Sequence, residues 1–199
     1  MSGLGDIAGM VLAGGASRRF GGSPKAFAQL GGKPLIAHAL RALSPLRYTA
    51  INANHNTSQF LEFASPVVPD IIEDAGPLGG IHAGLAWAST LEGIGWLATV
   101  AVDTPFLPAN FVAHIAGARD AEAVVAAVPG GISPVCALWD ISQLPELDFA
   151  LKRGVRRMTD YLKLITWRTV MLPPGEQDPL FNINTADDLA AAEGELKRL

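Results

Sequence analysis

The sequence has few of the residues that build disulfides and metal sites. Of its 199 residues one is a cysteine, Cys136, which excludes a disulfide within the chain and is typical of proteins in a reducing compartment. Its four histidines, His38, His55, His82 and His114, fall at none of the spacings that zinc ligands show. We therefore expect neither a disulfide nor a structural zinc site.

Long apolar runs and basic stripes are also absent. The longest apolar run, near residues 96–102, is far too short to cross a bilayer, and the first residues lack the basic and apolar regions of a signal peptide. The net charge is −4, which argues against nucleic acid as a partner. The sequence therefore predicts a cytoplasmic protein that binds no membrane and no nucleic acid, and whose ligand is small.

The composition favours one domain over residues 1–199, since 49% of the residues are hydrophobic and 17% are charged. Apolar segments typical of buried strands alternate with helical segments, which predicts an α/β fold, a three-layer sandwich with a mostly parallel sheet. In such folds the ligand lies at the carboxyl ends of the strands. The predicted strands are residues 7–12, 48–52, 67–68, 96–102, 123–128, 134–139 and 167–172, and the predicted helices are residues 34–43, 58–63, 78–89, 109–118, 142–150, 155–164 and 185–196.

A glycine-rich loop follows the first predicted strand, where residues 10–25 read MVLAGGASRRFGGSPK. Its spacing matches neither the Walker pattern GxxxxGK[ST] nor the dinucleotide pattern GxGxxG. Glycine lets backbone N–H groups approach an anion closely, and arginine or lysine neutralises the anion. The loop therefore predicts a phosphate site, although a tight connecting turn is the alternative. The residues concerned are Gly14, Gly15, Gly21, Gly22, Arg18, Arg19 and Lys25.

Polar residues or glycines follow other predicted strands, and the fold would bring them to the same sheet edge. Amides can recognise a base or a ribose, glycines admit a flat base, and a carboxylate can hold a cation. Each also has a structural alternative: the amides as turn formers or caps, and the carboxylate as a helix cap. These residues are Asn52, Asn54, Asp70, the GPLGG segment at residues 76–80, Asp103, Asn182 and Asn184.

With these motifs in view, the chain resembles the molybdenum cofactor guanylyltransferases, which join GTP to molybdopterin. The resemblance runs from Met10 to about Glu193, and its most specific elements include LAGG at residues 12–15, NAN at 52–54, DTP at 103–105, GVRR at 154–157 and NINT at 182–185. It implies a Rossmann-like nucleotidyltransferase fold, GTP and molybdopterin as substrates, and Mg²⁺ as a cofactor. It also suggests molybdoenzymes or cofactor-delivery proteins as partners.

The resemblance assigns roles residue by residue. Arg19, Lys25 and Asp103 would be catalytic, and Asp103 would also bind Mg²⁺. Arg156, Asn182 and Asn184 would face the pterin, although Arg156 and Arg157 could instead be a solvated helix face. With Gly15 and Gly79 added from the two glycine-rich segments, the predicted nucleotide-binding residues are Leu12, Ala13, Gly14, Gly15, Lys25, Asn52, Asp70, Gly79 and Asp103.

Two positions depart from the family pattern. Phe20 stands where methionine is usual, a swap between apolar residues. Ser133 precedes Pro134 where histidine is expected, so a substrate contact by that imidazole is missing. Two alternative functions are a cytidylyltransferase that uses CTP on the same pterin and a non-catalytic adaptor that delivers the cofactor. The second glycine of LAGG favours a purine, and Lys25 and Asp103 argue against the adaptor.

Overall fold

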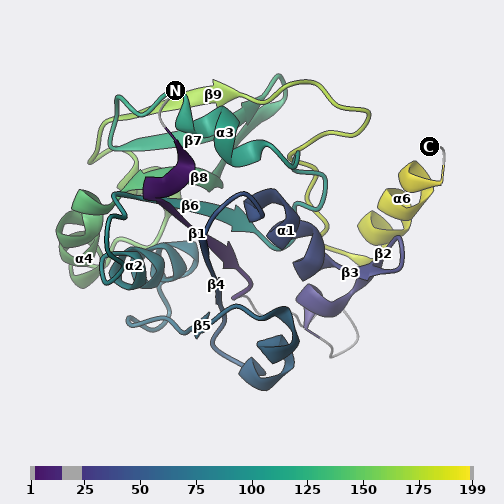
Figure 1. Cartoon of the computed structure of the whole chain (residues 1–199), viewed down its shortest axis with the longest axis horizontal. Helices are drawn as coiled ribbons and strands as arrows, with labels where there is room; N and C mark the ends of the chain where they lie inside the picture. The colour runs from purple at the N-terminus through teal and green to yellow at the C-terminus, as the bar shows by residue number, and fades with distance from the viewer. Residues whose placement is uncertain (1–2, 15–23, 198–199) are drawn as a thin grey trace.

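A computed structural model describes residues 3–14 and 24–197. In these residues seven strands form one sheet, in the order β5-β4-β1-β6-β8-β7-β9 (Figure 1). Every strand runs parallel to its neighbours except β8, which is antiparallel to β6 and β7. The strands are β1 (Ile7–Leu12), β4 (Tyr48–Asn52), β5 (Val67–Val68), β6 (Trp96–Ala101), β7 (Ala123–Val128), β8 (Gly131–Asp140) and β9 (Trp167–Met171).

Helices cover both faces of the sheet. Helices α1 and α3 pack on one face, and α2, α4 and α5 pack on the other, so the sheet lies between two apolar cores (Figure 1). The mostly parallel three-layer sandwich expected from the sequence is confirmed. The helices are α1 (Leu35–Leu43), α2 (Pro77–Ala88), α3 (Phe111–Ala116), α4 (Leu144–Lys152), α5 (Met158–Tyr161) and α6 (Ala186–Leu196), with 3-10 helices η1 (Leu4–Asp6), η2 (Lys25–Phe27), η3 (Thr57–Phe63) and η4 (Ile141–Gln143).

Strand β1 is the centre of this arrangement. All six of its residues are buried, and their side chains alternate between the two cores: Val11 packs on the face of α1, and Met10 on the face of α2. A strand covered on both faces reads as a continuous apolar run, which is why its bounds were predicted correctly. Helix α2 is buried over most of its length because it too is apolar on most of its surface.

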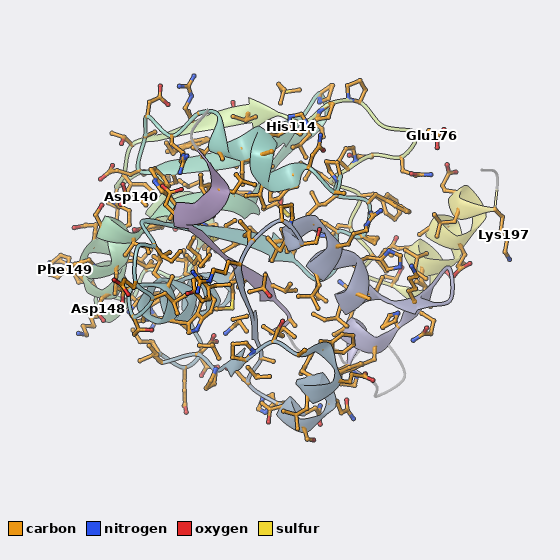
Figure 2. The ribbon with its side chains drawn as sticks, viewed as in Figure 1. His114, Asp140, Asp148, Phe149, Glu176 and Lys197 are labelled. Carbon is orange, nitrogen blue, oxygen red and sulfur yellow. The ribbon has the colours of Figure 1, made fainter. Side chains whose placement is uncertain are left out.

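A small hairpin and the last helix lie beside the sandwich. Strands β2 (Gln29–Leu30) and β3 (Lys33–Pro34) pair in antiparallel fashion, and α6 packs against them. The backbone N–H of Gly31, at the hairpin turn, donates to Oε1 of Glu193 at 2.6 Å. Figure 2 shows Lys197, at the end of α6, on the opposite side of the molecule from Asp148 and Phe149 of α4. The hairpin was not predicted, since two-residue strands leave no periodic pattern.

Three of the predicted elements differ from the observed ones. The helix expected at residues 109–118 is confined to α3, because the chain turns at Pro108 before it begins. The helix expected at 155–164 is reduced to the single turn of α5. Strand β8 is longer than expected and contains a bulge: Val125 pairs with Ala137 but Ala126 pairs with Ser133.

Buried hydrogen bonds hold this bulge in place. The hydroxyl of Thr99, on β6, donates to the carbonyl of Val135 at 2.7 Å, and the indole N–H of Trp139 donates to the same hydroxyl at 3.0 Å. Thr99 and Trp139 are fully buried. Buried polar groups of this kind depend on their partners, because water cannot replace them.

We expect Thr99→Val to lower the free energy of unfolding by about 1–3 kcal/mol, since it leaves the Trp139 N–H and the Val135 carbonyl without a partner. Urea unfolding measures the loss. Thr49→Val, which removes a half-buried hydroxyl bonded to Ser65, is the matched control. A loss no larger than the control's would contradict a structural role for Thr99.

Candidate active site

The carboxyl ends of three neighbouring strands form one edge of the sheet. In register, Leu12 of β1 pairs with Asn52 of β4 on one side and with Ala101 of β6 on the other. The pairing continues past the strands, because the N–H of Ala13 donates to the Asn52 carbonyl at 2.9 Å. Residues that follow β4 and β6 therefore lie on opposite sides of the end of β1, about 10 Å apart.

On the β6 side, Lys25 contacts Asp103 and Asn184. The Nζ of Lys25 donates to Oδ2 of Asp103 at 2.7 Å and to Oδ1 of Asn184 at 3.1 Å. The side chains of Lys25 and Asp103 are 15% and 20% exposed, so the ion pair is largely shielded from water. We call these three residues the lysine cluster. The structure thus brings together two predicted catalytic residues and one predicted pterin residue.

The chain around Asn184 is fixed by its neighbour. The N–H of Ile183 donates to the backbone carbonyl of Asp103 at 2.9 Å, and the Ile183 side chain is fully buried. Asn182 and Asn184, on either side, are exposed. Of the two, Asn184 accepts from Lys25. Thr185 begins α6 with a capping box, as one of the sequence alternatives predicted.

Asp103 lies in a turn and caps no helix. Oδ2 accepts from Lys25, while Oδ1 is buried and has no hydrogen-bond partner among the described residues. Beneath it, the buried Cys136 lies 3.5 Å from the hydroxyl of Thr104. Burial raises the pKa of the Cys136 thiol, and the charge of Asp103 raises it further. The cysteine is therefore kept neutral under a carboxylate that can accept a further ligand.

On the β4 side, two amides hold the carboxylate of Asp70. Asn52 Nδ2 donates to Oδ1 of Asp70 at 2.8 Å and to the Val68 carbonyl at 3.0 Å. Asn54 Nδ2 donates to Oδ2 of Asp70 at 2.8 Å, and the Asp70 N–H donates back to Oδ1 of Asn54 at the same distance. These bonds set which way each amide points. We call Asn52, Asn54 and Asp70 the amide cluster.

Glycines pack closely against the amide cluster. A Cβ at Gly14 would lie 3.3 Å from Oδ1 of Asn52, and a Cβ at Gly80 would lie 2.5 Å from the same oxygen. A Cβ at Gly79 would lie 3.1 Å from Oδ2 of Asp70. The GPLGG segment and the start of the first loop therefore meet at Asn52, and a side chain at Gly80 would displace the Asn52 amide.

Arg156 contacts neither cluster. Its Nη1 donates to the carbonyls of Leu151 and Val155 at 2.7 and 2.9 Å, so the guanidinium is a hydrogen-bond donor to backbone carbonyls at the C-terminal end of α4. Its own carbonyl lies 3.9 Å from where a Cβ of Gly76 would be, which puts it beside the start of α2. Arg156 is thus near the GPLGG segment, and its guanidinium is hydrogen-bonded to the backbone at the end of α4. Its assignment to the pterin stays a prediction.

Five residues of the predicted phosphate site lie outside the described residues, as does Phe20; the five are Gly15, Arg18, Arg19, Gly21 and Gly22. The sequence reasoning also missed Asp188, whose Oδ2 accepts from the N–H groups of Asn184 and Thr185, both at 2.8 Å. The Asn184 N–H, followed by the Thr185 hydroxyl, holds the pKa of the Asp188 carboxyl below its usual range. The capping-box spacing from Thr185 to Asp188 was the signal that could have identified it.

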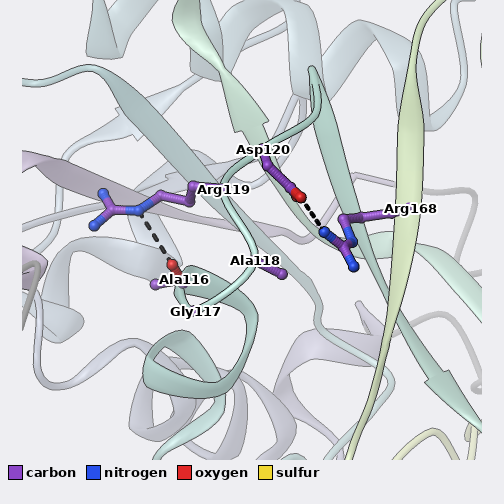
Figure 3. A pocket seen from close by; sticks show the side chains of 6 residues that line it. All are labelled: Ala116, Gly117, Ala118, Arg119, Asp120 and Arg168. Atoms are coloured by element: carbon purple, nitrogen blue, oxygen red, sulfur yellow. Dashed lines mark hydrogen bonds and ion pairs between the residues drawn. The ribbon is translucent and has the colours of Figure 1, made fainter.

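The described residues form surface hollows at opposite ends of the sheet's strands. One, of about 500 Å³, is lined by Pro24, Phe27 and residues of η3, directly beside Lys25. The other, of about 430 Å³, lies at the amino ends of β7 and β9, opposite the lysine cluster (Figure 3). There Arg168 pairs with Asp120, and Arg119 pairs with Asp6 through two bonds of 2.8 Å. Since both arginines are neutralised, this second hollow is a poor site for phosphates.

The chain was compared with known proteins. Residues 9–166 match the MobA-like NTP transferase domain. A molybdenum cofactor guanylyltransferase of Rhizobium leguminosarum bv. trifolii (strain WSM2304) is 41% identical, over 99% of this chain and 96% of that one. A protein of the same name from Bradyrhizobium sp. (strain ORS 278) is 38% identical, over 94% and 92%. The crystal structure of molybdopterin-guanine dinucleotide biosynthesis protein A from Archaeoglobus fulgidus superposes on this chain with a TM-score of 0.79. The two sequences are 26% identical, and the match covers 96% of this chain and 100% of that one.

We expect Gly80→Ala to weaken GTP binding about tenfold or more, because its Cβ would push Asn52 away from Asp70 and Val68. Calorimetric titration with GTP measures the change. Gly194→Ala is the control: it is also a helical glycine, and a Cβ there meets nothing within 4 Å. Equal GTP affinity in the two variants would remove Asn52 from the nucleotide site.

Proposed function

Because this chain belongs to the family of MobA-like NTP transferases, we propose that it transfers GMP from GTP to molybdopterin and releases pyrophosphate. The product is the guanine dinucleotide form of the cofactor. The observation that carries this proposal is the placing of the lysine cluster and the amide cluster at one sheet edge, on either side of β1. One side can serve phosphates and the other a base.

The reaction is a displacement at phosphorus. An oxygen of the terminal phosphate of molybdopterin attacks the α-phosphorus of GTP and forms a new P–O bond. The bond from the α-phosphorus to the oxygen bridging it to the β-phosphate breaks, and its electron pair leaves with pyrophosphate. The attacking phosphate is already ionised near neutral pH, so no protein nucleophile or general base is needed. Catalysis then consists of positioning and of electrostatic stabilisation.

Lys25 is a cation placed to bind the phosphates on the β6 side of the site. Asp103 and Asn184 fix the direction of its ammonium group, so little reorganisation is needed when charge develops on the phosphates. By the family resemblance, Arg19 and the amides of the first loop, including those of Gly14 and Gly15, would add further donors to the phosphates. Leu12 and Ala13 carry the chain from β1 into that loop.

Asp103 fits the role of a magnesium ligand. Its Oδ1 is a buried carboxylate oxygen without a hydrogen-bond partner in the described residues, and carboxylate oxygens are ligands that Mg²⁺ prefers. Mg²⁺ is usually held by one or two carboxylates together with phosphates and waters, so Asp103 could bind it with the phosphates of GTP. When bound, Mg²⁺ would neutralise phosphate oxygens during the transfer.

The amide cluster is the proposed base site. Asn52 Oδ1 faces Gly14 and Gly80, and its amide cannot flip without losing two bonds, so the position offers an acceptor of fixed direction. Guanine presents N–H donors that such an acceptor can bind. Gly79 packs beside Asp70, where a side chain would displace the carboxylate that holds Asn52.

The second substrate is assigned to the remaining polar residues. Asn182 and Asn184 are exposed at the lysine cluster, where the phosphate of molybdopterin must approach, and we keep Arg156, beside the start of the GPLGG segment, as a pterin residue. No helix in the described residues is long and apolar enough to cross a bilayer. The single buried cysteine supports a cytoplasmic location, and a molybdoenzyme or delivery protein would receive the product.

Transfer itself is tested with a nucleotide panel. With molybdopterin and magnesium, we expect pyrophosphate release with GTP and far less with CTP or ATP. Release with CTP alone would make the chain a cytidylyltransferase, and tight GTP binding without release would make it an adaptor.

Lys25→Ala should lower turnover by about 100-fold or more while the chain stays folded, because the ammonium group acts on charge that develops in the reaction. Pyrophosphate release measures turnover, and circular dichroism checks the fold. Lys33→Ala, which removes an exposed lysine on the nearby hairpin, should keep full activity. Activity of Lys25→Ala within a few-fold of wild type would exclude Lys25 from the site.

Asp103→Asn should reduce the effect of magnesium on GTP binding, since a neutral amide oxygen is a poorer ligand for a hard cation. GTP is titrated into both proteins with and without magnesium. If magnesium strengthens binding equally in the two proteins, the metal is held elsewhere.

A further inference from the structure

Asp188 contacts the chain at the residue that holds Lys25. Its Oδ2 accepts from the N–H of Asn184 and from that of Thr185, both at 2.8 Å, and Asn184 Oδ1 accepts from Lys25. We propose that Asp188 is a positioning residue for guanylyl transfer, a proposal that rests on the function proposed above. It holds the backbone at Asn184 so that the Asn184 side chain meets the lysine.

A helix cap alone does not account for these contacts. In a capping box the hydroxyl of the first residue accepts from the backbone three residues later, and the side chain there accepts from the first residue's N–H. Thr185 and Asp188 make both bonds, with the Asp188 N–H donating to Oγ1 of Thr185 at 3.1 Å. The bond from the Asn184 N–H lies outside the box, and it fixes the residue whose side chain accepts from Lys25.

Asn184 is anchored on its other side by Ile183, which bonds to the backbone of Asp103. Loss of the Asp188 carboxylate would therefore release one side of Asn184 while the buried Ile183 stays in place. The expected result is a displaced amide and a less constrained Lys25 in a chain that is still folded. This separates a positioning role from a general loss of structure.

The position of α6 makes this anchor important. The helix lies beside the sandwich, and its described contacts with the β2–β3 hairpin include the bond from Gly31 to Glu193. One core residue of α6, Ala192, is fully buried. Ala192, with Leu189 and Leu196 beside it, fixes the body of the helix on the core, and a local bond at the first turn is what places Asn184 to within about 0.5 Å.

The chain supplies two matched controls. Asp187 carries the same charge in the same first turn, and it makes no hydrogen bond or ion pair to any described residue. Asp187→Ala therefore removes the charge without the anchor. Thr185→Ala removes half of the capping box but leaves the N–H of residue 184 its acceptor on Asp188. It should lower the thermal midpoint as Asp188→Ala does.

The first measurement compares kcat and KM for GTP and molybdopterin in these variants. We expect Asp188→Ala to lower kcat about tenfold, the effect of one charge-assisted hydrogen bond, with less effect on the KM for GTP. Asp187→Ala and Thr185→Ala should keep kcat within about twofold. Asp188→Glu, the usual residue of a capping box, should restore most of the activity.

A double-mutant cycle then asks whether Asp188 acts through Asn184. In an Asn184→Ala background, Asp188→Ala should lower the thermal midpoint but cause no further loss of kcat. A further tenfold loss in that background would show that Asp188 acts by another route and would overturn the proposal. So would a kcat for Asp188→Ala equal to that of Asp187→Ala.

Hydrogen exchange supplies a readout that needs no activity. Asp188→Ala should speed amide exchange in residues 182–185 and also in η2, which carries Lys25, whereas Asp187→Ala should change neither. Faster exchange confined to α6 would overturn the proposal even if catalysis were lost. If the wild-type protein releases no pyrophosphate from GTP, the proposed function fails, and the exchange in η2 still decides the role of Asp188.

Discussion

The ion pair between Lys25 and Asp103 is the interaction that joins the functional segments of this chain. Asn184 also accepts from the Lys25 ammonium group. Asp103 and Asn184 lie 78 and 159 residues from Lys25 in the sequence, so three distant segments meet at this group. Each comes from an element with a different anchor: the turn after β6, the 3-10 helix η2 and the turn before α6. A lysine on a flexible stem becomes a directed cation because two oxygen acceptors fix it, which is what a phosphoryl-transfer site requires.

The other half of the site depends on the register of β1. Because Leu12 pairs with both Asn52 and Ala101, the ends of β4 and β6 are held at a fixed separation across β1. The amide cluster then depends on residues without side chains, since any Cβ at Gly80 would collide with Asn52. Strand register and close packing thus determine the site as much as its charged groups do.

The sequence predicted the strands of this sheet well and the connections less well. The bounds of β1 and β4 were predicted because a buried apolar run ends abruptly in polar residues, a local signal. The β2–β3 hairpin and the bulge of β8 were missed, since the first is too short for a pattern and the second depends on Thr99 and Trp139. Asp103, Asn52 and Asp70 were found because they follow strands. Asp188 was missed because its role arises from contact with Asn184 and, through it, with a lysine far away in the sequence.

Residues far apart in the sequence meet at this sheet edge for the same reason. Asn184, from the C-terminal half of the chain, accepts from Lys25 on the β6 side, whereas the Arg156 carbonyl lies near Gly76 at the start of the GPLGG segment. A parallel sheet brings the residues that follow different strands to one edge, so both halves of the chain can contribute to one site.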